Sequence, residues 1–440
     1  MMKKTNKKRG FTIIELTIVV AVIAILSAVL IPTFAGIIRK SRESADQQAV
    51  RNMNTVLSAA VLDEDSNIYD VYEALNESNI DADNYKPLFK DRFFFYDGAK
   101  QQVVYTDSDY KILYPEHLAK VTTEEDRAKW ISLSGTIKEV NVKDVAITGN
   151  TAKIEEAEEL VAVFNAINDK DSKVKDVNTI ELPASLNLMG AELNTAEVTT
   201  LTVKGPEAGA TLSGVVNLDA VRENDSNSAG TNRNYFAGLV GLSNGDVTFE
   251  NITIENSTFG CDSATMVGVF VGHAQSGTVT LKNVKVNNVT VRGMMKVGTF
   301  VGQLSNAAKL VVEDTTTVSN VTVEASVGFA GKFIGIAMGP NDNTGNLPTN
   351  PISVPKALAS NITVKLVKNS NVEYITVDGK EYATDMDVKN GVWSIADGTK
   401  QYCATVAEYG FLGGRYAKNA TKTTLSDGVL KYATMQEIVL

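Results

Sequence analysis

The chain has 440 residues, of which 42 are Lys or Arg and 52 are Asp or Glu, so its formal net charge is −10. This acidic balance disfavours a nucleic-acid partner, because nucleic-acid backbones are anionic. Apolar residues make up 44% of the composition, enough to fill the cores of two or three domains. The sequence leaves open whether Cys261 and Cys403, its two cysteines, form a disulfide outside the cell or remain thiols.

The N-terminus is basic and then strongly apolar. Five basic residues precede Gly10: Lys3, Lys4, Lys7, Lys8 and Arg9. From Phe11 to Ile31 the only charged residue is Glu15. A helix over this stretch rises about 1.5 Å per residue and is just long enough to cross the core of a bilayer. Its basic end is expected on the cytoplasmic side.

A cleaved secretory signal and a plain membrane anchor are the two ordinary interpretations of such a stretch. Glu15 argues against both, because an ionised carboxylate costs about 2.5–3.5 kcal/mol at the membrane centre and therefore needs a partner. Pro32 is expected to kink or end the apolar helix. Beyond it, apolar residues recur at helical spacing from Phe34 to Val61. This spacing predicts one long helix with an amphipathic outer half, which a discarded leader would not have.

The segment Gly10-Phe11-Thr12-Ile13-Ile14-Glu15-Leu16 resembles the processing site of type IV pilins and pseudopilins. The resemblance implies that a prepilin peptidase cuts between Gly10 and Phe11, and that the new amino group of Phe11 is methylated. It also implies that Glu15 offsets the terminal amine of a neighbouring subunit in a filament core. Such an amine, with a pKa of about 8, is mostly cationic at neutral pH and needs a partner when buried. Pro32 stands where helices of this family are often bent.

Residues 63–150 are expected to form a small α+β head similar to that of pilins. A short helical pattern covers Tyr69 to Leu75. Aromatic and β-branched runs at 93–96, 102–105 and 111–114, separated by turn residues, predict a three-stranded meander. Trp130 to Leu133 begins a further apolar segment.

A glycine motif recurs four times, and its closing glycines, Gly241, Gly272, Gly302 and Gly335, are 31, 30 and 33 residues apart. A second series, Asn256, Asn288 and Asn320, keeps a spacing of 32 residues, and Asn361 follows after a Pro- and Gly-rich insertion. A fixed period of this size predicts a solenoid. The asparagines are expected either to turn the chain or to form a side-chain ladder.

Further columns are predicted at the same spacing of 32 residues: Val247, Val279 and Val311; Ile254, Val286 and Val318; and the charged set Glu250, Lys282 and Asp314. Alternation of apolar and polar residues within them predicts strands with one packed face. Residues 151–372 resemble right-handed parallel β-helices with GLUG-type repeats. A helix over Ile154–Ile167 is expected to cap the first turn of the β-helix. Residues 373–440 are predicted to form a small β-rich segment.

No catalytic, cofactor or metal site is predicted. Some β-helices are polysaccharide lyases or glycosidases, which need clustered carboxylates or a metal-bound base. The column Glu250, Lys282 and Asp314 instead alternates in charge, as in a solvated ion-pair ladder. His117 and His273 lie in different predicted modules and have no Cys, Asp or Glu at metal-ligand spacing.

The sequence therefore predicts a non-enzymatic, multidomain subunit of a cell-surface filament. Its parts are a leader (1–10), a long helix (11–62), a small head (63–150), an all-β parallel β-helix (151–372) and a β-rich C-terminal segment (373–440). The precursor is expected to span the cytoplasmic membrane once before the mature chain joins an extracellular filament.

The expected partners are other pilin subunits, the prepilin peptidase and the assembly machinery, with a surface or glycan ligand of the β-helix left open. Two alternatives remain. One is a pseudopilin of a type II secretion or DNA-uptake system, and the other is a surface-tethered, polysaccharide-active β-helix enzyme.

Overall fold

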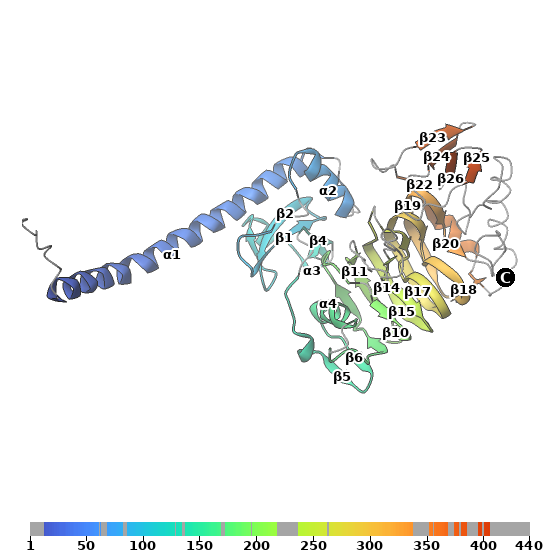
Figure 1. Cartoon of the computed structure of the whole chain (residues 1–440), viewed down its shortest axis with the longest axis horizontal. Helices are drawn as coiled ribbons and strands as arrows, with labels where there is room; N and C mark the ends of the chain where they lie inside the picture. Colours follow the sequence, from blue (N-terminus) through green and yellow to red (C-terminus); the bar gives the residue numbers. More distant parts are fainter. Residues whose placement is uncertain are drawn as a thin grey trace, which may run out of the picture.

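The computed structural model describes residues 13–60, 62, 68–81, 86–127, 129–133, 137–168, 172–194, 196–217, 236–261, 264–337, 352–354, 356–367, 374–377, 380–384, 395–397 and 400–404. One extended helix leads into a small head, and the head is followed by a large curled sheet (Figure 1). A small antiparallel sheet follows the curled sheet along the chain.

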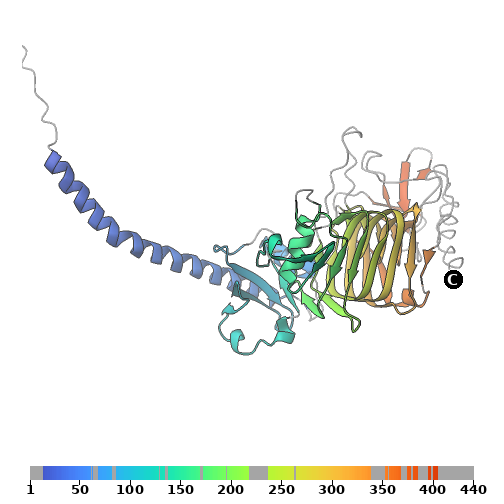
Figure 2. The ribbon, with the colours of Figure 1, turned by 90° about the horizontal axis from the view of Figure 1, so that it is seen from below.

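Helix α1 (Ile13–Leu57) is 45 residues long, about 68 Å at the rise of an α-helix. It does not end at Pro32, although the proline leaves the carbonyl of Ala28 without its usual helical donor. Figure 2 shows α1 as a curved rod, the form in which long helices absorb small irregularities of this kind. After Leu57 the chain tightens, since Ala59 N donates to Val56 O and Ala60 N to Leu57 O.

The head is an antiparallel sheet of order β3-β2-β1-β4, against which α1 and α2 (Ile68–Glu77) pack. Its strands are β1 (Arg92–Asp97), β2 (Gln102–Asp107), β3 (Ile112–Tyr114) and β4 (Trp130–Ser132). The predicted meander of three strands is confirmed, and the apolar segment after Trp130 supplies a fourth strand beside β1. Between β3 and β4 lie η1 (Leu118–Lys120) and α3 (Glu124–Arg127).

The curled sheet is formed by strands β5 to β22, and its strand pairs are parallel apart from the β5–β6 hairpin. The helical elements within this region are η2 (Val142–Asp144), α4 (Ala157–Ala166) and η3 (Lys356–Asn361). Its strands are β5 (Ala146–Thr148), β6 (Thr151–Lys153), β7 (Thr179–Glu181), β8 (Ser185–Asn187), β9 (Ala196–Val198), β10 (Leu201–Lys204), β11 (Ala210–Ser213), β12 (Val216–Asn217), β13 (Phe236–Ala237), β14 (Val240–Asn244), β15 (Val247–Phe259), β16 (Met266–Val267), β17 (Val271–Gly298), β18 (Val301–Val312), β19 (Thr317–Gly331), β20 (Ile334–Ala337), β21 (Ile352–Ser353) and β22 (Ile362–Leu366).

The glycine motifs stack on one another. The residues just before the four closing glycines, Val240, Val271, Val301 and Ile334, are register partners in successive strands. The motif phenylalanines Phe270, Phe300 and Phe333 form a column in the core beneath them, with ring centroids 6.2 and 5.6 Å apart. The predicted glycine series therefore marks positions that are in register in neighbouring strands of the sheet.

One set of predicted columns is wrong by a single residue. Val279 pairs with Leu310 rather than with Val311, because the spacing between Gly272 and Gly302 is 30 residues and one irregularity after Ala274 restores only part of the difference. The spacing of 32 returns at the next strand, where Val286 pairs with Val318 as expected. Uneven turn lengths thus shift a register that a constant period cannot describe.

The asparagine series does both of the things expected of it. Asn256, Asn288 and Asn320 are all left-handed, with φ of 48°, 51° and 47°. Their side chains also form a ladder, in which the Nδ2 of each donates to the Oδ1 of the preceding asparagine at 2.9 Å. A second ladder joins Asn283 to Asn251 at 2.9 Å, and its spacing of 32 residues was the sequence signal that would have revealed it.

Replacing Asn288 by Ala, which loses its two ladder hydrogen bonds, should lower the free energy of local opening of the curled sheet by roughly 2–5 kcal/mol. Left-handed φ costs a non-Gly residue about 1–2 kcal/mol, and each lost hydrogen bond costs about 0.5–1.5 kcal/mol. Asn288→Gly loses the same bonds without the backbone cost, so it should be the milder change. Amide hydrogen exchange in β17 measures the free energy of local opening in both variants. An equal loss of this free energy in the two would show that the left-handed φ of Asn288 does not contribute to the difference.

The predicted helix over Ile154–Ile167 is present as the shorter α4, which packs on the core of the curled sheet. It begins at Ala157 because Glu156 and Glu159 form a capping box. The buried side chains Leu160, Val163 and Phe164 of α4 join the core of the sheet.

The C-terminal sheet has the order β23-β24-β26-β25 and is antiparallel. Its strands are β23 (Tyr374–Val377), β24 (Lys380–Thr384), β25 (Ile395–Asp397) and β26 (Lys400–Ala404). The described part of the predicted β-rich segment therefore consists of strands.

Candidate assembly site

The N-terminal part of α1 exposes a long apolar surface. Among the side chains that the structure describes, Leu88 and Val121 are the only exposed large apolar residues outside α1. On α1 their exposed fractions range from 49% at Val22 to 80% at Ile13. The set is Ile13, Ile14, Leu16, Ile18, Val19, Val20, Val22, Ile23, Leu26, Phe34, Ile37 and Ile38. An apolar surface of this extent marks a site of interaction with a membrane or another protein.

The four predicted site residues fall in or just before this helix. Glu15 and Pro32 lie within α1, whereas Gly10 and Phe11 lie outside the described residues. Over the described residues, none of the helices meets the length and apolarity required of a membrane span.

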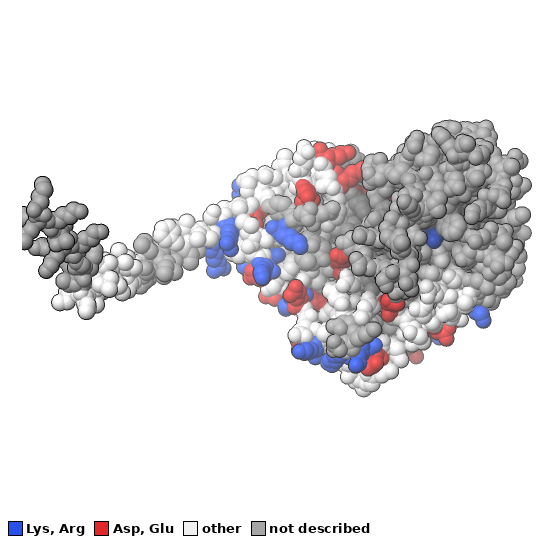
Figure 3. Space-filling model, viewed as in Figure 1, with Lys and Arg blue, Asp and Glu red and all other residues white. Residues whose placement is uncertain are grey.

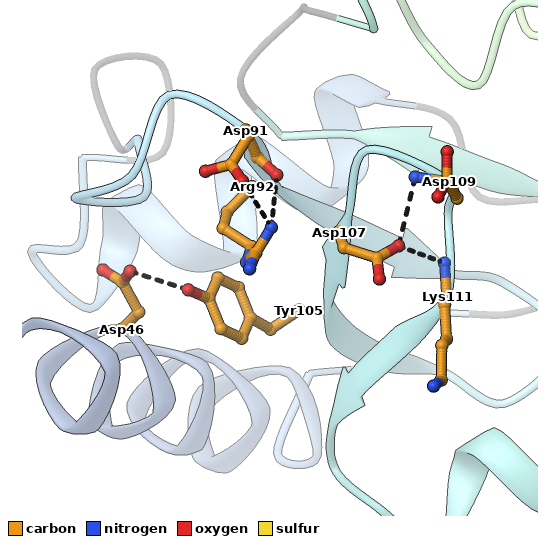
Figure 4. Close-up of polar contacts among 7 residues, drawn as sticks. All are labelled: Asp46, Asp91, Arg92, Tyr105, Asp107, Asp109 and Lys111. Carbon is orange, nitrogen blue, oxygen red and sulfur yellow. Dashed lines mark hydrogen bonds and ion pairs between the residues drawn. The ribbon is translucent and has the colours of Figure 1, made fainter. Parts of the chain in front are cut away.

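A buried carboxylate fixes α1 to the head (Figure 4). Asp46 of α1 is 1% exposed and accepts hydrogen bonds from the backbone N–H of Leu88, at 3.0 and 3.2 Å, and from the hydroxyl of Tyr105, at 3.1 Å. Burial raises the pKa of Asp46 above its ordinary value, and these two hydrogen bonds only partly oppose the effect. Burial and the adjacent Asp46 also raise the pKa of Tyr105.

Two further polar contacts of α1 reach the head sheet. Asn54 Nδ2 donates to Val103 O at 3.0 Å and its Oδ1 accepts from Val103 N at 2.5 Å, so the side chain is bound by the edge of β2. Arg51 Nε donates to the hydroxyl of Tyr114 at 2.8 Å, with its guanidinium 5.3 Å from the ring centre. Met53 and Leu57 are buried between these contacts, so the last turns of α1 belong to the head core.

Replacing Asp46 by Asn should change how the stability of the head depends on pH. Because the folded-state pKa is raised, the folded head binds more protons than the unfolded chain once the pH exceeds about 4. The contribution of Asp46 is therefore most favourable at low pH and is lost as the pH rises through the folded-state pKa. In the Asn variant the stability of the head should fall less as the pH rises, as measured by amide exchange of β2 between pH 3.5 and 7. An unchanged pH dependence of stability would show that Asp46 does not titrate with a raised pKa in the folded head.

The head is also joined to the curled sheet. Tyr110 and Met189 pack against the core of the sheet and against the head cluster around Phe95 and Trp130. The Tyr110 hydroxyl donates to Glu158 Oε1 of α4 at 2.7 Å and accepts from Lys138 N at 3.3 Å. Burial raises the pKa of Tyr110, so this hydroxyl stays protonated.

Backbone and side-chain hydrogen bonds reinforce this joint. Ser132 N of β4 donates to Met189 O, and Asn187 Nδ2 donates to Arg127 O at 2.6 Å. Gly190 has φ of 75°, and a Cβ there would lie 2.5 Å from Ser132 N. The head is thus packed against the curled sheet at residues 187–190, a contact that the sequence did not indicate.

The predicted charged column differs at its third member. Lys282 Nζ lies 2.7 Å from Glu250 Oε1, and this hydrogen bond raises the pKa of Lys282. On the next strand the neighbour of Lys282 is Glu313, not Asp314, because β17 and β18 are paired here at a spacing of 31 residues. The surface around Lys282 therefore alternates in charge and does not present a pair of neighbouring carboxylates.

The two histidines lie apart, His117 before η1 in the head and His273 in β17. His273 Nε2 is 2.9 Å from Ser305 Oγ and 3.0 Å from Gln303 Nε2. Burial, together with the charge of Lys296, lowers the pKa of His273 to about 3. Its Nδ1 is buried without a hydrogen-bond partner in the described structure. Within those same residues, no group of three His, Cys, Asp or Glu side chains is placed to hold a metal ion.

Comparisons with known proteins match only part of the chain. The prokaryotic N-terminal methylation motif matches residues 5–31. A stretch of 56 residues is 43% identical to the type IV major fimbrial protein FimA of Dichelobacter nodosus. That stretch is 13% of this chain and 36% of the relative, so the chain spans about a third of the length of the protein it matches. No solved structure matches the chain. At its N-terminus the chain therefore carries the signal of the type IV pilins.

Proposed function

We propose that the chain is a type IV pilin-like subunit of a cell-surface filament. The observation that carries this proposal is that the signal at residues 5–31 includes the first part of α1, a helix whose large apolar side chains are exposed. Exposure of this kind is unfavourable in water, at about 25 cal/mol per Å² of apolar surface. The helices of other copies are partners of matching shape and chemistry.

The processing steps follow from the same resemblance. Cleavage between Gly10 and Phe11 leaves α1 intact and creates a terminal amine a few residues before Glu15. In the filament, Glu15 of one copy pairs with the amine of the next. Before assembly, the precursor spans the cytoplasmic membrane through the apolar segment that starts at Phe11.

We further propose that the curled sheet is a right-handed parallel β-helix. The support is its parallel register between strands about one repeat apart, its single continuous core and its stacked glycine motifs. Its role is to extend the subunit outward and to present a polar surface for structural or adhesive contacts.

Catalysis is not part of this proposal. The Ser305–His273 contact has the spacing of a nucleophile and its base. A histidine with a pKa of about 3 accepts protons poorly at neutral pH, and no carboxylate orients its Nδ1 among the described residues. Incubation of the full chain with plant and bacterial glycans should release no sugar, whereas a sugar product would favour the polysaccharide-active alternative.

Labelling of intact cells tests the main proposal. Antibodies against residues 151–372 should decorate extended fibres, and peptides of this chain should be found in sheared fibre preparations. Decoration confined to the cell envelope, with no fibres, would favour the pseudopilin alternative, whose filament stays short.

A further inference from the structure

The base of the head, where α1 enters it, is basic (Figure 3). Arg39, Lys40 and Arg42 of α1 are exposed, and they directly follow the last exposed isoleucines, Ile37 (57%) and Ile38 (52%). The apolar part of α1 therefore ends in a group of three cations at the point where the head begins.

A loop of the head lies beside these cations. Lys86 and Lys90 are exposed on either side of Leu88, which is itself 53% exposed. The backbone N–H of Leu88 donates to Asp46, one helical turn beyond Arg42. The buried carboxylate described above thus holds an apolar side chain and two lysines against the base of α1.

We define the basal surface as Arg39, Lys40, Arg42, Lys86, Leu88 and Lys90. Three carboxylates lie close to it: Glu43, which is exposed; Asp46, which is buried and hydrogen-bonded to Leu88; and Asp91, whose carboxylate is paired with Arg92 at 2.8 Å. Positive charge is therefore in excess at this end of a chain whose net charge is −10.

The length of the apolar helix fits a bilayer that ends at this surface. From Ile13 to Ile38 the helix rises about 39 Å, compared with about 30 Å for a hydrocarbon core and about 40–45 Å with the headgroups. When the N-terminal end of α1 lies at one face of the membrane, Arg39 to Arg42 reach the headgroups of the opposite face.

We infer that the basal surface docks on anionic phospholipid headgroups of the outer face of the cytoplasmic membrane while the subunit awaits assembly. The inference rests on the proposed function, because it requires α1 to be inserted. Cationic side chains near an anionic lipid surface are each stabilised, and their aliphatic stems bury beside the acyl boundary. Leu88, exposed between two lysines, is an apolar anchor of the kind that enters the headgroup layer.

Depth measurements on the full-length chain test the inference. With Cys261 and Cys403 replaced by Ser, a nitroxide label is placed at position 88, 121 or 23, replacing Leu88, Val121 or Ile23. Each protein is inserted into nanodiscs of phosphatidylcholine alone or with phosphatidylglycerol, at one chain per disc. Accessibility to oxygen and to a water-soluble nickel complex then gives the depth of each label.

The label at position 88 should lie at headgroup depth in discs with phosphatidylglycerol and move into water in phosphatidylcholine or at high salt. The label at 121, equally exposed on the free head, should stay in water in both. Replacing Lys86 and Lys90 by Gln should lower the ratio of docked to undocked heads about fivefold per lysine. The matched double change Lys138→Gln and Lys143→Gln, away from the basal surface, should leave the ratio unchanged.

The label at position 23 separates the inference from the proposed function. A label at 23 in hydrocarbon with the label at 88 in water overturns the basal surface and leaves the membrane-inserted precursor intact. A label at 23 in water overturns both. Shielding of position 88 that appears only with two chains per disc would identify a second copy as the partner and also overturn the lipid assignment.

Discussion

Replacement of Gly10 by Leu should abolish maturation, so that the chain keeps residues 1–10. The resemblance to the prepilin cleavage site makes Gly10 the small residue that the peptidase requires before the cut bond. The precursor should still insert, because the apolar segment after Phe11 is unchanged. Mass spectrometry of the membrane-bound chain measures the result directly.

Gly36 provides the matched control. It lies in α1, and a Cβ there would meet nothing within 4 Å. Gly36→Leu therefore adds the same bulk to an open position beyond the signal and should leave cleavage intact. A mature mass in Gly10→Leu would remove the peptidase assignment.

Replacement of Glu15 by Ala should leave the precursor inserted and cleaved but nearly absent from filaments. Removing one partner of a buried ion pair leaves the other charge uncompensated, at a cost of about 3–5 kcal/mol. That cost corresponds to a fall in incorporation by a factor of roughly 100 to 5,000. Quantitative blotting of sheared fibres against the membrane fraction gives the ratio.

Two substitutions at the same position separate charge from size. Glu15→Gln keeps the size but loses the charge, so it should behave like Glu15→Ala. Glu15→Asp keeps the charge on a shorter side chain and should retain part of the incorporation. Incorporation of Glu15→Gln at the normal level would refute the pairing of Glu15 with a terminal amine.

Elements whose signals are local were predictable from the sequence. Strands β1, β2 and β23 are short aromatic and β-branched runs bounded by turn residues, and the glycine motifs mark the register of the curled sheet. The helix α1 was expected from its spacing, although its passage through Pro32 was not decided by the sequence. Local pattern determines such elements because neighbouring side chains alone decide which face is buried.

Contacts between distant segments were not predictable. Tyr110 meets Glu158, and Asn187 meets Arg127, with no motif that relates either pair. Tyr110 and Met189 also take left-handed φ, of 56° and 51°, which no residue preference indicates for these types. The same holds for Asp46 and Leu88, whose contact depends on how the loop folds over α1.

The joint at Tyr110 and Met189 has a consequence for how a polymer of this subunit would look. A domain on a flexible linker takes many orientations, and averaged images of it are blurred. Here the head and the curled sheet share core residues and hydrogen bonds, so the curled sheet keeps a fixed orientation relative to α1. Repeated along a shaft, such subunits would stand out as sharply defined, evenly spaced knobs.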